Sequence, residues 1–261
     1  MSTSLVTTFA GADHLSYSSG STNGDGANAK FYAPRGVAIS PDGTYALIAD
    51  DFNNLIRRII ISTAYVTTLA GVAGTTGSTN GVGTNAKFNG PRRVTISPDG
   101  TFALIADTAN HLIRQIVLST ASVTTLAGVA GTTGSTNGVG TNAKFNSPVG
   151  VCVSPDGTYA LIGDGSNYRV RQLIISTASV TTLVGSGDSI GSTNGVGTNA
   201  KLAPYGIDIS PDGTYALFAD YGNHRIRQIV ISTANVTTLA GSVYGFTDGV
   251  GTMSNSRTHT M

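Results

Sequence analysis

One phrase of sequence returns along this chain at nearly constant intervals, and this periodicity constrains the fold more than any other feature. The phrase is V-T-T-[FL]-[AV]-G, and its copies begin at Val6, Val66, Val123, Val180 and Val236. By subtraction the spacings are 60, 57, 57 and 56 residues. A period of this length is typical of proteins in which each copy is one supersecondary unit that stacks on its neighbours. The sequence therefore predicts a repeat architecture.

Composition indicates that the repeated unit is built from strands. All 14 acidic residues are Asp, so Glu, a good helix former, does not occur. The chain also contains 34 Gly, a residue that favours turns. Because 40% of the 261 residues are apolar, the chain has ample material for a core. We expect an all-β fold.

The first unit divides into four short strands. Residues 36–40 and 44–49 are separated by the turn Pro41-Asp42-Gly43, in which proline presets φ and glycine accepts a positive φ. The β-branched stretches 55–61 and 65–70 provide a third and a fourth strand. Four antiparallel strands make one blade of a β-propeller.

Four such blades fit the chain. They are expected over residues 31–71, 88–128, 145–185 and 202–241 of a propeller domain that spans residues 1–241. A lone outer strand is expected at residues 5–11, and residues 242–261 are expected to form a C-terminal loop or tail. The polar stretch 71–89 recurs without change at 128–146 and is too long for a hairpin turn. We interpret it as a crossover between blades, whose Lys-Phe end anchors an apolar side chain between them.

A family resemblance follows from the motifs inside the units. The chain reads Asn110-His111-Leu112 within the pattern D-x-x-N-x-x-[IV]-R, which occurs in all four units, and it carries motifs similar to G-x-G-x-x-A-x-F, P-x-G-V and V-T-T-L-A-G. The chain therefore resembles the NHL-repeat β-propellers of the long-repeat type. It departs from their D-G-x-G loop, where Asn replaces Asp at Asn23, Asn80, Asn137 and Asn194.

The number of blades leaves the closure of the ring open. The resemblance implies six blades, whereas this chain has four and one additional strand. Four blades can close on themselves, remain an open arc or be part of a longer propeller. An open arc exposes two blade faces, through which two copies could form a homodimer, and leaves the first strand free to pair with a partner chain.

Residues that recur in every unit are assigned to the scaffold. An Arg follows the Asp of each A-D or G-D pair by seven residues, as in Asp50 and Arg57. We interpret these pairs as ties between neighbouring strands or blades. The Asp of each S-P-D-G phrase is interpreted as a turn residue.

Residues that differ between units are the better candidates for a binding site. The resemblance implies that the start of the inner strand and the loop after the second strand lie on the ligand face. These two places carry Arg35, Arg92, Arg93, Tyr205, Phe52, His111, Tyr168 and His224. Such a mixture of Arg, Tyr and His suits anionic or aromatic partners. We therefore expect a non-catalytic scaffold that binds a protein partner.

Two alternative functions remain. Some NHL proteins bind RNA, and related propellers include metal-dependent lactonases and lyases. With no Glu, and with His14 and His259 near the ends of the chain, no metal or acid–base cluster is visible in the sequence. Asp208 is a weak metal candidate because its counterparts are small and uncharged, and it is expected to be buried. We expect no cofactor, because the G-x-G-x-x-A segments precede strands instead of helices.

Charge and hydropathy add little about partners or location. The formal net charge is +1, and 11% of the residues are charged, so no general affinity for nucleic acid or anionic membranes is indicated. The sequence shows neither a signal peptide nor a transmembrane segment. The compartment is left open.

Overall fold

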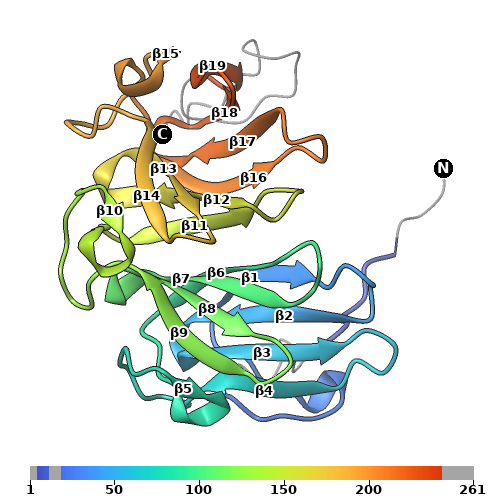
Figure 1. The fold of residues 1–261 in the computed structure, drawn as a ribbon. Helices are drawn as coiled ribbons and strands as arrows, with labels where there is room; N and C mark the ends of the chain where they lie inside the picture. Colours follow the sequence, from blue (N-terminus) through green and yellow to red (C-terminus); the bar gives the residue numbers. More distant parts are fainter. Residues whose placement is uncertain (1–4, 12–18, 243–261) are drawn as a thin grey trace, which may run out of the picture.

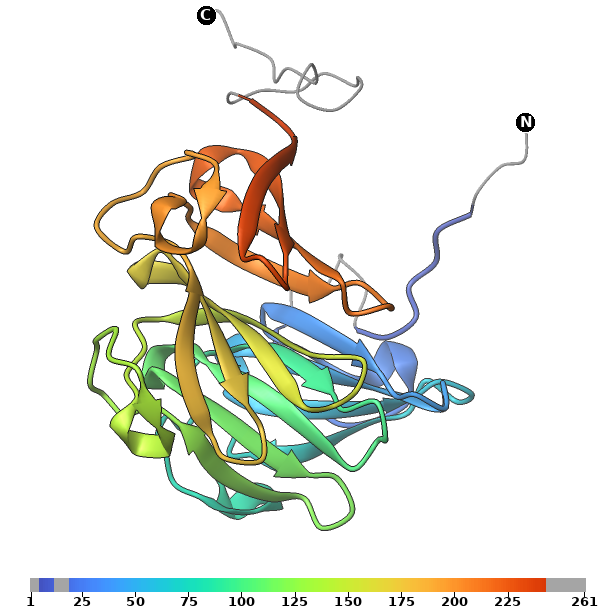
Figure 2. The same cartoon turned by 45° about the horizontal axis from the view of Figure 1, so that its top comes forward.

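The computed structural model describes residues 5–11 and 19–242 and is built from β-strands, turns and short 3₁₀ helices. Its strands form four antiparallel sheets that follow one another in chain order as propeller blades (Figure 1). Figure 2 shows the fourth blade, in orange, on the side of the third that faces away from the second. The predicted all-β propeller is thus confirmed. Within the described residues, no helix is long and apolar enough to cross a membrane.

Each blade contains four six-residue strands that pair antiparallel with their neighbours in sequence. Blade 1 consists of β1 (Pro34–Ile39), β2 (Tyr45–Asp50), β3 (Leu55–Ile60) and β4 (Val66–Gly71). Blade 2 consists of β6 (Pro91–Ile96), β7 (Phe102–Asp107), β8 (Leu112–Val117) and β9 (Ser122–Ala127). Blade 3 consists of β11 (Pro148–Val153), β12 (Tyr159–Asp164), β13 (Arg169–Ile174) and β14 (Ser179–Val184). Blade 4 consists of β16 (Pro204–Ile209), β17 (Tyr215–Asp220), β18 (Arg225–Val230) and β19 (Asn235–Ala240).

The crossovers contribute more structure than the sequence predicts. Each adds a two-residue strand to the outer edge of the blade it enters, as β5 (Gly81–Val82), β10 (Gly138–Val139) and β15 (Gly195–Val196). Blade 1 has only an isolated bridge between Gly24 and Val66 at this place. The extra strand covers part of an edge that would otherwise expose unpaired backbone groups. Each crossover also contains a 3₁₀ turn: η2 (Gly26–Asn28), η4 (Gly83–Asn85), η6 (Gly140–Asn142) or η8 (Gly197–Asn199).

The core consists of separate apolar layers between successive blades. We call the face of a blade that meets the preceding blade its leading face, and the opposite one its trailing face. Between blades 1 and 2, Leu47 and Ile56 of the trailing face pack with Val94 and Ile105 of the leading face. Phe88, at the end of the crossover, is fully buried in the same layer. This confirms that the Lys-Phe end anchors an apolar side chain between blades.

A buried ion pair recurs in all four blades. In blade 2, Arg114 Nη1 lies 3.0 Å from Asp107 Oδ2, and both side chains are fully buried. The guanidinium also donates to the crossover, through Nη1 to the Lys87 carbonyl and through Nη2 to Asn80 Oδ1. Burial raises the pKa of Asp107 to about 6. The recurring Arg therefore ties a strand to a crossover, and Asn80, which stands where the resemblance implies Asp, is one of its acceptors.

The series of blades is uncovered at both ends. On the leading face of blade 1, Val37 and Ile39 are 58% and 65% exposed, and on the trailing face of blade 4, Ile226 is 41% exposed. Residues 5–11, expected as an outer strand, carry no strand in the structure, because no strand among the described residues lies beside them to pair. Residues 243–261, most of the expected tail, lie outside the described part of the chain.

Candidate functional site

Strand register brings the two variable regions to one end of the blades. Pro34, at the start of inner strand β1, pairs with Asp50, at the end of β2, and the other blades repeat this register. The start of each inner strand therefore lies beside the loop after the second strand. These loops contain the 3₁₀ turns η3 (Asp51–Asn53), η5 (Thr108–Asn110), η7 (Gly165–Asn167) and η9 (Tyr221–Asn223). We call this end of the blades the upper face.

Three predicted residues from three blades meet at the upper face. Arg35 and Arg92 lie at the carboxylate of Asp51, and Tyr205 contacts Arg35. Arg35 Nε donates a short hydrogen bond to Asp51 Oδ2, and Arg92 Nε lies 3.7 Å from the same oxygen. Arg35 Nη1 also donates to the hydroxyl of Tyr205 at 3.4 Å. The hydrogen bond to Asp51 raises the pKa of Arg35 above its ordinary value. Because two guanidiniums share one carboxylate, the group Arg35, Asp51, Arg92 and Tyr205, here the upper-face cluster, carries a net positive charge.

Aromatic side chains border this cluster on both sides. Phe52, which is 51% exposed, lines a hollow of about 380 Å³. Tyr205 and Tyr221 line a second hollow of about 420 Å³. The rings of Tyr205 and Tyr221 lie 5.3 Å apart. Arg92 lines both hollows, so its charge is available to a ligand in either.

The predicted residues His111, Tyr168 and His224 hold equivalent places at the ends of 3₁₀ turns. All three end a 3₁₀ turn in the left-handed conformation, with φ of 60°, 54° and 56°. His111 Nδ1 accepts a hydrogen bond from the Ser147 amide at 3.0 Å and so links blades 2 and 3. Burial lowers the pKa of His111. Tyr168 also lines the second hollow, whereas His224 is exposed beside Ile226 at the end of the arc.

Arg93 and Asp208 lie apart from the upper-face cluster. Arg93 is half-buried, and its Nε has no hydrogen-bond partner. Asp208 was expected to be buried, but it is exposed and accepts only from the adjacent Ile209 amide at 3.1 Å. The expectation was wrong because Asp208 belongs to the trailing face of blade 4, against which no blade packs within the described part of the chain. Among the described residues, no group of three His, Cys or Asp could hold a metal ion.

Sequence reasoning missed Asp51, the residue that joins the two Arg side chains. A signal for Asp51 was present, because its counterparts are Thr108, Gly165 and Tyr221, and no two of these four residues are alike.

The single cysteine, Cys152, is buried, and burial strongly raises the pKa of its thiol. A shift in this direction disfavours the thiolate, which is the nucleophilic form of cysteine.

Fold, repeat and buried Arg–Asp ties together define a β-propeller built from one duplicated blade. No family model matches the chain. The resemblance to NHL-repeat propellers is confirmed by the chain's similarity to curated proteins of that name. The chain is 28% identical over 163 residues to human NHL repeat-containing protein 2. The aligned region covers 59% of this chain and 22% of the relative. The chain is 29% identical over 243 residues to SUPPRESSOR OF QUENCHING 1 of Arabidopsis thaliana. This aligned region covers 88% of this chain and 23% of the relative.

Solved structures show the same fold at low sequence identity. A chain from the nidogen/laminin complex superposes with a TM-score of 0.61 at 13% identity, over 84% of this chain and 69% of that one. An auxiliary nutrient binding protein from Bacteroides thetaiotaomicron superposes with a TM-score of 0.56 at 16% identity, over 97% and 69%. These likenesses concern the architecture alone.

Proposed function

We propose that this chain is a non-catalytic binding propeller whose upper face takes an acidic segment of a protein partner. The observation that carries the proposal is the upper-face cluster, in which Arg35 and Arg92 share the single carboxylate of Asp51. A partner carboxylate would satisfy the guanidinium donors that Asp51 leaves unused. Charge-assisted hydrogen bonds of this kind are stronger than neutral ones and fix the orientation of the ligand.

The surroundings of the cluster favour a peptide over a free ion. Tyr205, Tyr221 and Phe52 offer aromatic surface within the two hollows that Arg92 lines. Tyr and Arg are enriched at protein interfaces because they combine large contact area with hydrogen bonding. An acidic segment with apolar neighbours would therefore match both parts of the surface.

The chemistry of the cluster supports binding more than catalysis. A guanidinium remains protonated at any physiological pH, so Arg35 and Arg92 cannot exchange protons with a substrate. Asp51 is held between them and is only 3% exposed. The Asp51 carboxylate is therefore engaged by the two guanidiniums instead of being open to a substrate.

The test is a binding screen on the full chain. The probes are fluorescent octapeptides that contain Asp, Glu and Tyr, paired with peptides in which Asn and Gln replace the acids. We expect the acidic peptides alone to bind, and R92A to weaken them about tenfold, the effect of losing one charge-assisted contact of about 1.4 kcal/mol. R58A is the matched control, because Arg58 stacks on Tyr45 and does not line either hollow.

Two outcomes would overturn the proposal. Equal binding of acidic and neutral peptides would remove the charge recognition on which it rests. Binding of pooled RNA that depends on Arg92, with no binding of acidic peptides, would replace the protein partner with RNA, whose phosphates would show a steep salt dependence.

A further inference from the structure

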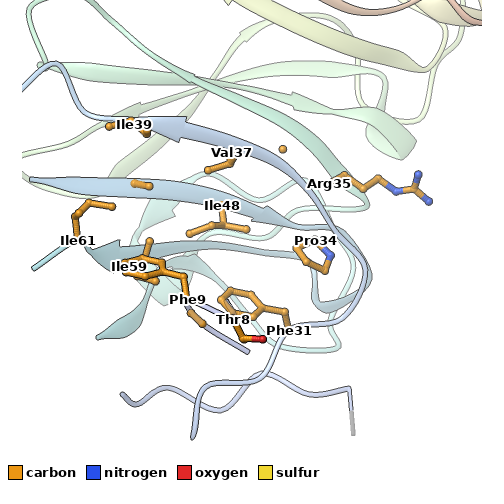
Figure 3. Close-up of a pocket in the computed structure, with 13 residues that line it drawn as sticks. Thr8, Phe9, Phe31, Pro34, Arg35, Val37, Ile39, Ile48, Ile59 and Ile61 are labelled. Atoms are coloured by element: carbon orange, nitrogen blue, oxygen red, sulfur yellow. The ribbon is translucent and has the colours of Figure 1, made fainter. Parts of the chain in front are cut away.

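The upper-face hollow of about 420 Å³ brings a cation beside apolar and aromatic side chains. Arg92 lines it together with Ile190 and Tyr221, which are 48% and 73% exposed. The apolar cavity of about 520 Å³ on the leading face of blade 1 lacks this combination, because Arg35, its one charged lining residue, points away from it (Figure 3). We call the hollow lined by Arg92, Ile190 and Tyr221 the Ile190 hollow.

The residues that shape the Ile190 hollow depart from the repeat. Ile190 stands where the crossovers into blades 2 and 3 carry Thr76 and Thr133. The crossover into blade 4 is also one residue shorter between its Lys and its Pro, in the segment that borders the hollow. Gly222 stands where the loops of the other blades carry Phe52, Ala109 and Ser166. The hollow is therefore a feature of one blade interface and not of the repeated scaffold.

Close packing holds Ile190 in the wall of the hollow. A Cβ atom on Gly222 would overlap the Cδ1 atom of Ile190 and lie 3.2 Å from the Cβ atom of Ala203. The side chain of Ile190 therefore occupies space that any larger residue at position 222 would need. The segment before Ile190 is fixed as well, because Arg169 Nη2 donates to the Ser186 carbonyl at 3.2 Å. Ile190 thus presents a positioned apolar surface to a ligand.

Tyr221 supplies aromatic surface in the same hollow. Its ring lies 5.3 Å from that of Tyr205, and the two planes are tilted by 38°. Since Tyr221 is 73% exposed, most of its ring remains accessible. Aromatic side chains favour offset and edge-to-face contacts with one another. A further ring can therefore join this pair within the hollow.

We propose that the acidic segment bound by the upper face carries an aromatic residue one or two positions from its Asp or Glu, and that this ring fills the Ile190 hollow. This inference rests on the proposed function and adds a requirement to it. The ring packs on Ile190 and Tyr221, and the neighbouring carboxylate accepts from Arg92. Two residues of an extended chain span about 7 Å, so one short segment reaches both. Ile190, Gly222 and Tyr221 therefore determine specificity.

The test compares four fluorescent octapeptides on the full chain by fluorescence polarisation. The first has Phe directly after Asp, and the second has the same composition with Phe and Asp at opposite ends. The third and fourth have Leu or Ala in place of Phe. We expect the first peptide to bind at least about fivefold more tightly than the second and the fourth, and about twofold more tightly than the third.

Two variants take their new residues from equivalent places in the chain, where the fold already accommodates them. I190T introduces the residue of Thr133, and Y221T introduces that of Thr108. We expect each variant to remove most of the advantage of the first peptide over the Ala peptide and to leave the affinity for the Ala peptide unchanged. V139T is the matched control, because Val139 is 54% exposed and lines neither hollow.

Failure of this inference is distinct from failure of the proposed function. Equal binding of the first two peptides, both weakened by R92A, would overturn the aromatic requirement and leave the acidic segment in place. Equal binding of the Phe and Leu peptides would overturn the aromatic class. An equal loss in I190T for the Phe and Ala peptides would also overturn the inference, since Ile190 would then act through the cluster. If none of the four peptides binds, both proposals fall.

Discussion

At the scale of single residues, two kinds of Arg–Asp pair perform different tasks. The pair of Arg114 and Asp107 is fully buried and repeated in every blade, whereas Arg35 is 39% exposed in its pair with Asp51. A buried charge that loses its partner destabilises the fold strongly, while an exposed pair contributes little to stability. The repeated pairs therefore hold the scaffold, and the unique pair shapes the upper face.

Replacing Arg114 should destabilise the protein. We expect R114M to lower the free energy of unfolding by about 3 to 5 kcal/mol, because Asp107 is left buried without its cation. Urea denaturation measures this loss. Q115A, at the adjacent half-buried position, is the control and should stay within about 1 kcal/mol. An R114M protein as stable as the wild type would show that the buried pair is not a tie.

Replacing Asp51 should strengthen the binding of acidic peptides. D51N keeps the shape of the side chain but removes the charge that competes with the ligand for Arg35 and Arg92. We expect about tenfold tighter binding in fluorescence polarisation, equivalent to about 1.4 kcal/mol. Weaker binding in D51N would show that Asp51 positions the two guanidiniums instead of competing for them.

At the scale of elements, the S-P-D-G turn shows how sequence determines local structure. In blade 1, Asp42 Oδ1 accepts from the hydroxyl of Ser40 at 2.6 Å and from the Thr44 amide at 3.1 Å. The hydrogen bond from Ser40 lowers the pKa of Asp42, and the same arrangement lowers the pKa of its counterparts Asp99, Asp156 and Asp212. The turn therefore favours the ionised carboxylate.

These four turns should make the folded state less stable as the pH falls into the acid range. A lowered pKa in the folded state contributes stability above the ordinary carboxyl pKa of about 4, and this contribution is lost as the pH falls through the lowered value. We expect the Tm of the wild type to fall more steeply between pH 5 and pH 2 than that of D42N/D99N/D156N/D212N. Parallel Tm curves from the two proteins would contradict this account.

The strands and turns could be predicted because each has a strong local signal. Alternating apolar residues and S-P-D-G mark all four main strands of each blade, and the Lys-Phe end marked the buried anchor. The two-residue strands β5, β10 and β15 were missed, because Gly-Val in a polar stretch has no periodicity. The exposure of Asp208 was missed as well, since its local sequence does not show that the trailing face of blade 4 lacks a covering blade.

At the scale of the whole molecule, the residues proposed to bind a partner differ from the scaffold residues in their place in the repeat. Arg35, Arg92 and Tyr205 hold the same place in three units, and the blade arrangement brings them together. His111 was selected by the same criterion, but it links two blades, as Asn54 does through the Gly90 amide. Sequence variation between units therefore marks candidates, and the contacts show which of them also link blades.

The order of the blades explains why blades 1 and 4 differ from blades 2 and 3. In repeat proteins, stability is approximately a sum of unit and interface contributions. Blades 2 and 3 are covered on both faces, while blades 1 and 4 each leave one face uncovered among the described residues. Among the described residues, the uncovered faces of blades 1 and 4 therefore lack the interface contribution that blades 2 and 3 have on both sides.

We propose that the variable upper-face residues bind a partner, whereas the recurring residues hold the fold. The most direct measurement is the affinity of R35V/R92V for the acidic octapeptides, together with its Tm, since Val149 shows that the fold accepts Val at this position. The account predicts that binding is lost while the Tm stays within about 4 °C of the wild type, a change of about 1 kcal/mol. Unchanged binding, or a collapse of the Tm, would contradict it.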